Sequence, residues 1–159
     1  MPNSYRKGYR AENQLERIFK QNGINAKRVP LSGGSTFAKG DIHIEKESKT
    51  LKVEVKVRKD AFNILYNTLS VNSNNIISIE QPSLESLVLM RLTDLLSILR
   101  GELSLEEVQE MLRDAGTTRI TRGLKKVCDY LSGSDILVIK ADRKDFLSIV
   151  LQKTLPEIF

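Results

Sequence analysis

The stretch Leu51-Lys-Val-Glu-Val-Lys-Val-Arg58 decides the fold of the first half of the chain, because apolar and charged residues alternate in it without exception. This period of two is typical of a β-strand with one buried and one polar face. The four apolar residues therefore share one face of the predicted strand. The other face carries the charged residues Lys52, Glu54, Lys56 and Arg58.

A second strand with the same alternation is predicted just upstream, at Gly40-Asp-Ile-His-Ile-Glu45. If residues 46–50 form the turn of a hairpin, Asp41 and Glu54 converge and Lys56 lies beside them. Two carboxylates and a lysine at one sheet edge suit a phosphodiesterase that uses a divalent metal. Alternating charges are also typical of a solvated sheet face, so these three residues alone leave both interpretations open.

An amphipathic helix is predicted from Tyr9 to Asn22, followed by Gly23 as a left-handed helix end. Glu12 lies on or beside the apolar stripe of this helix. A carboxylate that faces a sheet needs a metal, a cation or hydrogen bonds to offset its desolvation. The alternative is an ordinary glutamate near a helix start, where it favours the positive end of the dipole.

Positive charge is concentrated in the same region. Residues 1–28 contain seven Lys and Arg against two Glu, a local net charge of +5 that equals the net charge of the whole chain. Such a patch beside a candidate carboxylate site predicts a polyanionic partner such as nucleic acid, with Arg6, Lys7 and Arg10 as candidate DNA contacts. A solubilising basic surface remains the alternative.

Residues 29–40 are rich in Gly and Ser and predict a loop. The spaced Gly-Lys-Ser/Thr ending of a P-loop is missing, so no nucleotide cofactor is expected. Ser32 and Ser35 are candidate phosphate contacts. A plain connecting loop would explain the same composition.

The remainder of the chain predicts scaffold elements within one domain that spans residues 1–159. A short helix or irregular segment is expected at 61–69, and a loop at 70–75. Strands are expected at 87–92, 135–141 and 146–151, and helices at about 93–100, 104–116 and 118–131. The region 93–131 is a candidate helical insertion.

Neither an N-terminal signal sequence nor a membrane-spanning apolar run is evident, so no membrane association is expected. Cys128 is the one cysteine, which fits a reducing cytoplasm. His43, the one histidine, shares the polar face with Asp41; it supports the metal ligands, acts as a general base, or is an incidental strand residue.

The order of these motifs resembles the archaeal-type Holliday-junction resolvases, a family also found in phages and part of the PD-(D/E)xK nuclease superfamily. The resemblance covers residues 5–58. It rests on Tyr5-Arg-Lys-Gly-Tyr-Arg-Ala-Glu12, on Ala26-Lys-Arg-Val-Pro-Leu-Ser-Gly-Gly34, and on Gly40-Asp41 with Val53-Glu-Val-Lys-Val57. It implies an α/β fold with a restriction-endonuclease-like core, in which helices flank a central mixed sheet.

By this resemblance, the catalytic positions of the family are Glu12, Asp41, Glu54 and Lys56. Arg28 matches an arginine near the site, and Ser32 matches a serine of a mobile loop implicated in cleavage. Asp41, Glu54 and Glu12 would then hold Mg²⁺, with Mn²⁺ as a substitute. Two departures stand out: Gly40 replaces the proline of the superfamily name, and Asn13 replaces an arginine found in some members.

The expected function is metal-dependent cleavage of four-way DNA junctions by paired symmetric cuts. Paired cuts need two sites, so a homodimer is expected. Two alternatives remain open: a nuclease of the same superfamily that acts on flaps, nicks or duplex DNA, and a non-catalytic DNA-binding accessory module of recombination.

Overall fold

An eight-stranded mixed β-sheet forms the centre of the computed structural model, which describes residues 3–30, 40–59, 62–71 and 75–159. The strands follow the spatial order β1-β2-β3-β7-β8-β5-β4-β6. Neighbouring strands run antiparallel except in the pairs β3–β7 and β4–β6, which are parallel. The strand bounds are β1 Ala26–Arg28, β2 Ile42–Lys46, β3 Lys49–Arg58, β4 Ile76–Glu80, β5 Leu87–Arg91, β6 Thr117–Arg119, β7 Ile136–Ala141 and β8 Leu147–Leu151.

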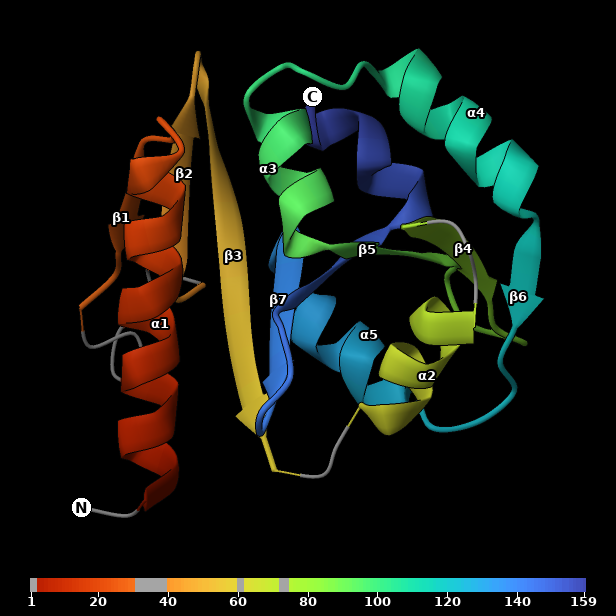
Figure 1. The fold of residues 1–159 in the computed structure, drawn as a ribbon, viewed down its shortest axis with the longest axis horizontal. Helices are drawn as coiled ribbons and strands as arrows, with labels where there is room; N and C mark the ends of the chain where they lie inside the picture. The colour runs from red at the N-terminus through yellow and green to blue at the C-terminus, as the bar shows by residue number, and fades with distance from the viewer. Residues whose placement is uncertain (1–2, 31–39, 60–61, 72–74) are drawn as a thin grey trace.

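Helices cover both faces of this sheet (Figure 1). Their bounds are α1 Asn3–Gln21, α2 Asn63–Val71, α3 Leu92–Leu99, α4 Leu105–Ala115, α5 Lys125–Leu131 and the 3₁₀ helix η2 Gln152–Ile158. Apolar side chains of α1, α3, α4 and η2 pack on one face, and those of α2 and α5 pack on the other. This arrangement confirms the predicted α/β fold with a central mixed sheet flanked by helices.

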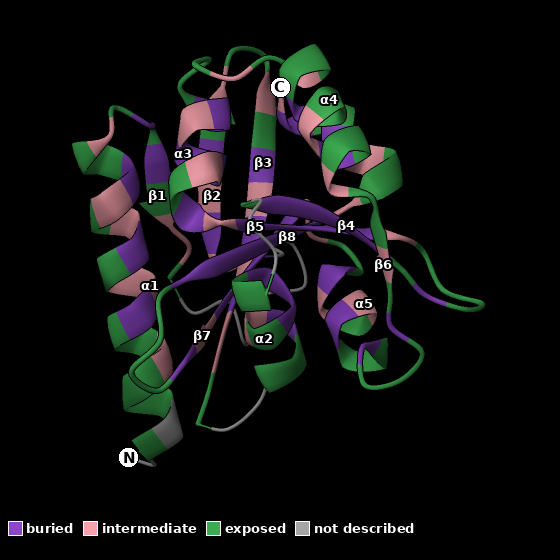
Figure 2. Cartoon of the chain, turned by 45° about the vertical axis from the view of Figure 1, so that its right-hand side comes forward, coloured by how far each residue is buried: buried purple, intermediate pink, exposed green. Residues whose placement is uncertain are grey.

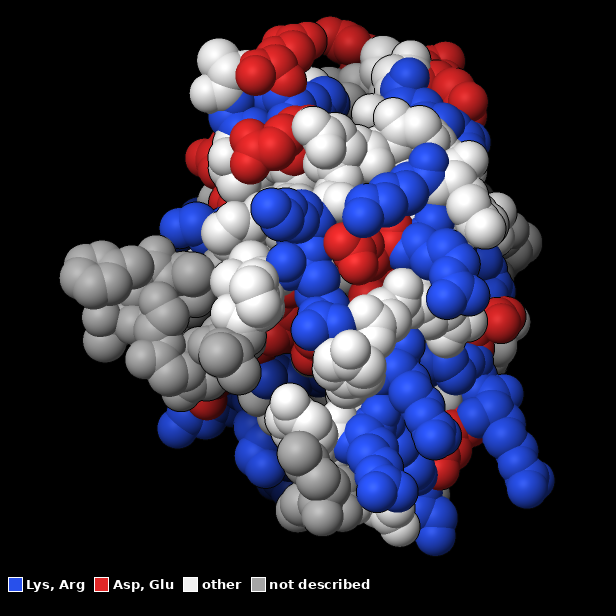
Figure 3. Space-filling view, turned by 90° about the vertical axis from the view of Figure 1, so that its left-hand side faces the viewer, with Lys and Arg blue, Asp and Glu red and all other residues white. Residues whose placement is uncertain are grey.

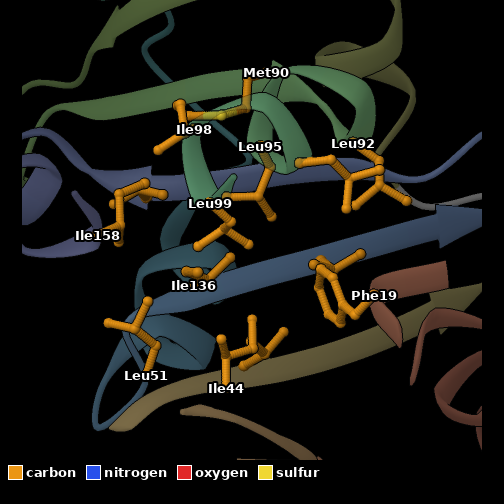
Figure 4. Packing of buried hydrophobic residues seen from close by; sticks show 14 of the residues in the cluster. Phe19, Ile44, Leu51, Met90, Leu92, Leu95, Ile98, Leu99, Ile136 and Ile158 are labelled. Carbon is orange, nitrogen blue, oxygen red and sulfur yellow. The ribbon is translucent and has the colours of Figure 1, made fainter. Parts of the chain in front are cut away.

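The two faces of the sheet bury two separate apolar clusters because side chains alternate along each strand. Val55 and Val138 belong to the cluster under α1 and α3, whereas Leu137 and Ile139 belong to the cluster under α2 and α5. Figure 4 shows Phe19 of α1 and Leu95 of α3 above the first face. In Figure 2, β5 and β8 are buried almost throughout, while α1 carries a buried stripe on one side only.

The β2–β3 hairpin forms as the alternation predicts, with Ile42 opposite Val53 and Ile44 opposite Leu51. The helix ends predicted at Gly23 and at Ser104 are also confirmed. Gly23 has φ 74°, and Ser104 and Glu107 form a reciprocal capping box at the start of α4.

The predicted helix at 118–131 is wrong in its first half. Thr117–Arg119 instead forms β6, which pairs in parallel with β4, and α5 begins only at Lys125. Gly123 lies between them with φ 92°, a conformation that no α-helix tolerates. The region 93–131, a predicted helical insertion, therefore also contributes a strand to the sheet.

Other elements differ in extent. α1 begins at Asn3 instead of Tyr9, and three short strands, β1, β4 and β6, add to those expected from the sequence. Within the described ranges, no helix is both long and apolar enough to cross a membrane.

Candidate active site at the start of β2

The backbone of Asp41 is fixed on both sides just before β2 begins. Its N–H donates to the carbonyl of Val53 over 2.8 Å, and its carbonyl accepts from the N–H of Val29 over 2.9 Å. Its side-chain Oδ2 accepts from the N–H of Val55 over 2.8 Å. The carboxylate therefore substitutes for a main-chain acceptor where the ladder of β2 ends, and continuing the register places Asp41 opposite Glu54.

Gly40 makes this arrangement possible. Its φ is 87°, and a Cβ at this position would lie 3.3 Å from both the Val53 carbonyl oxygen and the Lys52 Cβ. Proline, whose ring fixes φ near −65°, cannot adopt this conformation. The replacement of the superfamily's proline by glycine is thus matched by the local backbone, and the aspartate still reaches the edge of β3.

Glu54 and Lys56 lie on the same face of β3 and form an ion pair, with 2.6 Å between Oε1 and Nζ. Their side chains are 20% and 25% exposed, so the pair is only partly hydrated. By strand alternation this face is the one that α5 covers, and the Lys56 ammonium lies 5.1 Å from the ring centroid of Tyr130 in that helix.

Glu12 approaches the same group of charges from α1. It follows the buried Ala11 and is itself half-buried, which confirms that it lies beside the apolar stripe. Burial raises the pKa of the Glu12 carboxyl, and the nearby charges of Asp41 and Glu54 raise it further, while Arg28 and Lys56 lower it. Glu12 therefore lies within electrostatic range of Asp41, Glu54 and Lys56.

Arg28, at the end of β1, contacts several side chains of α1, including Glu12. Its Nε lies 3.5 Å from Glu12 Oε2, its Nη1 donates to Asn13 Oδ1 over 2.6 Å, and its guanidinium stacks 4.3 Å from the centroid of Tyr9. Its backbone N–H donates to Glu16 over 3.0 Å. Asn13, which departs from the arginine of some relatives, thus serves here as a partner of Arg28.

The three predicted DNA contacts on α1 are exposed near its N-terminal end. Lys7 pairs with Asp142 over 3.1 Å, and Arg6 and Arg10 lie on the same exposed half of the helix. Figure 3 shows many Lys and Arg side chains over the lower half of the face seen from the α1 side, with acidic side chains between them. Ser32 and Ser35, the predicted phosphate contacts, lie outside the described residues.

The donor chemistry at this site suits a hard divalent cation, since carboxylate oxygens are the ligands that Mg²⁺ prefers. Burial is the main cause of the raised pKa of Glu12, and the negative charges of Asp41 and Glu54 add to it, so a cation at this position would favour the ionised carboxylate. Among the described residues, however, no group of three or more His, Cys, Asp or Glu side chains is arranged as a ready metal site. Glu54 is turned to Lys56 and Glu12 to Arg28.

Two residues near the predicted site were not found from the sequence. Tyr130 contacts Lys56 from the last turn of α5, and Tyr9 stacks on Arg28. Neither contact could be predicted from the sequence, because each joins two separate elements and no repeating pattern along the chain relates their residues. His43 occupies β2 between Lys27 and Lys52 of the neighbouring strands, and its role stays a prediction.

A family model supports the resemblance that the sequence motifs indicate. The family model described as archaeal Holliday junction resolvase (hjc) matches residues 3–88, just over half of the chain. No match was found among the curated proteins. Among solved structures, the Holliday junction resolvase Hjc of Archaeoglobus fulgidus, an archaeal hyperthermophile, is similar, with 18% sequence identity, a TM-score of 0.36, and coverage of 94% of this chain and 95% of that one.

Proposed function

The chain belongs to the archaeal Holliday junction resolvase family, and on this basis we propose that it is a metal-dependent DNA endonuclease that resolves four-way junctions. The observation that carries the proposal is the position of Asp41, held by Val55 opposite Glu54, with Lys56 and Glu12 in electrostatic range. All four residues fall within the segment that matches the family.

Asp41, Glu54 and Glu12 are the proposed ligands of Mg²⁺, with Mn²⁺ as its substitute. Once bound, the ion would polarise the scissile phosphate and lower the pKa of the attacking water. Asp41 is oriented for this role by the backbone of β3, because Val55 fixes one of its oxygens.

Lys56 is the proposed stabiliser of the phosphate as negative charge develops on it. Its ammonium lies 2.6 Å from Glu54 and faces the Tyr130 ring, so two neighbours restrain it. Glu54 is both a proposed ligand of the cation and the ion-pair partner of Lys56, which keeps the ammonium next to the proposed phosphate site. Arg28 would keep Glu12 beside the site, since it contacts both Glu12 and Asn13.

The basic surface of α1 is the proposed contact with the DNA backbone, through Arg6, Lys7 and Arg10, with Arg28 closer to the site. Ser32 and Ser35 complete the proposed contacts, and Ser32 is the one proposed to take part in cleavage. Two symmetric cuts in one junction need two active sites, so the active species is proposed to be a homodimer.

A cleavage assay tests the proposal. A labelled synthetic four-way junction, a matched linear duplex and a flap are each incubated with the protein in Mg²⁺ and in EDTA. Paired cuts that need Mg²⁺ and are confined to the junction are expected. Cutting of flap or duplex instead would assign a different substrate to the same chemistry, and tight junction binding without cutting in Mg²⁺ or Mn²⁺ would favour the accessory module.

A further inference from the structure

A pocket of about 230 Å³ lies beside the candidate active site, between the end of β3, the start of α2 and helix α5. Its walls are mainly apolar. Phe62 and Ile64 line one side, and Leu124 and Val127 line the other. Val127 and Leu124 are buried and form the inner wall of the pocket. Ile64 is 42% exposed, so it lies at the opening to solvent.

Tyr130 joins this pocket to the proposed catalytic residues. Tyr130 lines the pocket, and the centroid of its ring lies 5.1 Å from the ammonium of Lys56. Its hydroxyl lies 3.4 Å from Nη2 of Arg58, two residues further along β3. A group that enters the pocket would therefore lie next to a phosphate bound at Lys56.

The charged residues of the pocket are both cations. Arg58 and Lys126 are exposed, and none of the described residues that line the pocket is Asp or Glu. Aromatic and aliphatic walls with a cationic edge match a ligand that has a flat face for stacking and carries a phosphate. A nucleotide unit of a DNA strand has this chemistry.

Phe62 has an unusual backbone conformation that contributes to the pocket. Its φ is 70°, which is rare for a bulky residue and carries a conformational cost. Its carbonyl accepts the N–H groups of Leu65 and Tyr66 over 2.9 and 3.2 Å, which starts α2. Sites of this kind are frequently functional, and this one places an aromatic ring opposite α5.

We propose that this pocket takes one unpaired base of the DNA strand that is cut, an inference that rests on the proposed function. The volume lies below the roughly 300–1,000 Å³ of typical small-molecule pockets, so it suits a single base and not a larger ligand. Bases in a duplex are stacked, and extracting one costs least where it is already unpaired. The pocket would therefore favour branched or distorted DNA over intact duplex. The proposed catalytic residues would contact a phosphate, which is the same in both kinds of DNA.

The test measures binding without cleavage, using the full chain in EDTA. Two labelled duplexes differ only at one central bulged position, which holds either an unpaired adenine or an abasic residue. The wild-type protein is expected to bind the adenine probe about fivefold more tightly or better, the lower end of what base stacking on an aromatic ring contributes.

Two variants remove the pocket in different ways. Ile64→Trp fills it from an exposed position, and Tyr130→Leu removes its ring while keeping apolar bulk. Val71→Trp is the matched control, because Val71 lies on the same helix, is 82% exposed and does not line the pocket. The control is expected to keep the preference for adenine.

Loss of the adenine preference in either pocket variant supports the proposal. Equal binding of both probes by the wild type, or a preference that persists in both pocket variants, overturns it. The junction cleavage assay in Mg²⁺ separates this inference from the proposed function. Cleavage without a base preference would support the proposed nuclease activity and contradict base binding in the pocket. A base preference without cleavage would support base binding and contradict the nuclease activity.

Discussion

Val55 donates its backbone N–H to Oδ2 of Asp41 over 2.8 Å, at the point where the ladder between β2 and β3 stops. The backbone of β3 therefore orients the carboxylate of Asp41, which immediately precedes β2. Preorganisation of this kind lowers the cost of assembling a charged site, because the carboxylate does not have to be ordered when a ligand binds.

Asp41→Asn is expected to abolish cleavage while leaving the fold intact. The amide oxygen can still accept from Val55, but the neutral side chain is a poor ligand for a divalent cation. The single-turnover rate on a four-way junction should fall on the order of a hundredfold or more. Junction binding in EDTA and the melting temperature should stay close to wild type, and an unchanged cleavage rate would remove Asp41 from the site.

Gly40→Ala is expected to destabilise the protein by about 1–3 kcal/mol, because the alanine Cβ would sit at positive φ and close to the Val53 carbonyl. Gly8→Ala is the matched control. Gly8 lies inside α1 and has open space around the position of a Cβ, so alanine should stabilise the helix by about 0.5–1 kcal/mol. Denaturant unfolding of both variants measures this, and equal effects of the same sign would contradict the account of Gly40.

Arg28→Gln is expected to raise the pKa of Glu12 further. In the metal-free wild type this pKa already lies above its ordinary value of 4.5, mainly because of burial and then because of Asp41. Arg28 is a neighbouring positive charge that opposes the rise, so its removal favours the protonated carboxyl. NMR titration of the glutamate side chains in wild type and variant would show this. A lower pKa in the variant would mean that Arg28 does not act on Glu12 electrostatically.

Asp94 should make the protein less stable as the pH rises through the acidic range. Burial raises the pKa of this α3 carboxyl above its ordinary 3.8, and its Oδ2 is buried without a hydrogen-bond partner. The folded state therefore keeps a proton that the unfolded state has already lost. This contribution to stability is complete below pH 3.8 and disappears as the pH rises through the folded-state pKa.

Asp94→Asn should remove that part of the pH dependence, as measured by urea unfolding between pH 3.5 and about 7. Asp114→Asn, at an exposed position near the end of α4, is the control for the loss of an acidic side chain. An Asp94→Asn profile that parallels wild type would show that the buried carboxyl titrates normally.

Substitutions of Lys7 and of Asp142 should change the affinity for DNA in opposite directions. Lys7→Ala removes one proposed phosphate contact and should reduce the slope of log K against log salt by about 1. Asp142→Asn releases Lys7 from its ion pair and should tighten binding. Neither change should alter stability by more than about 1 kcal/mol, because the pair is exposed. Lys20→Ala, at the far end of α1, is the control for general loss of charge, and an equal effect there would argue against a specific contact.

The sequence by itself determined the elements whose signals are local. The alternation at 51–58 fixed β3 and its buried face, the paired pattern at 40–45 fixed β2, and Ser104 with Glu107 fixed the start of α4. These signals work because strand alternation and helix capping depend only on residues a few positions apart. The approach of Asp41 to Glu54 followed from the same hairpin register.

Only the tertiary structure decided what depends on distant segments. The short strand β6 exists because β4 offers it a partner, and three residues carry too little pattern to show this alone. Two further contacts join elements that only the fold brings together. Lys56 lies against the ring of Tyr130, and Arg28 pairs with Glu12 and donates a hydrogen bond to Asn13. The charged residue types were readable from the chain, but their partners depend on how helices pack across a sheet, which local sequence does not encode.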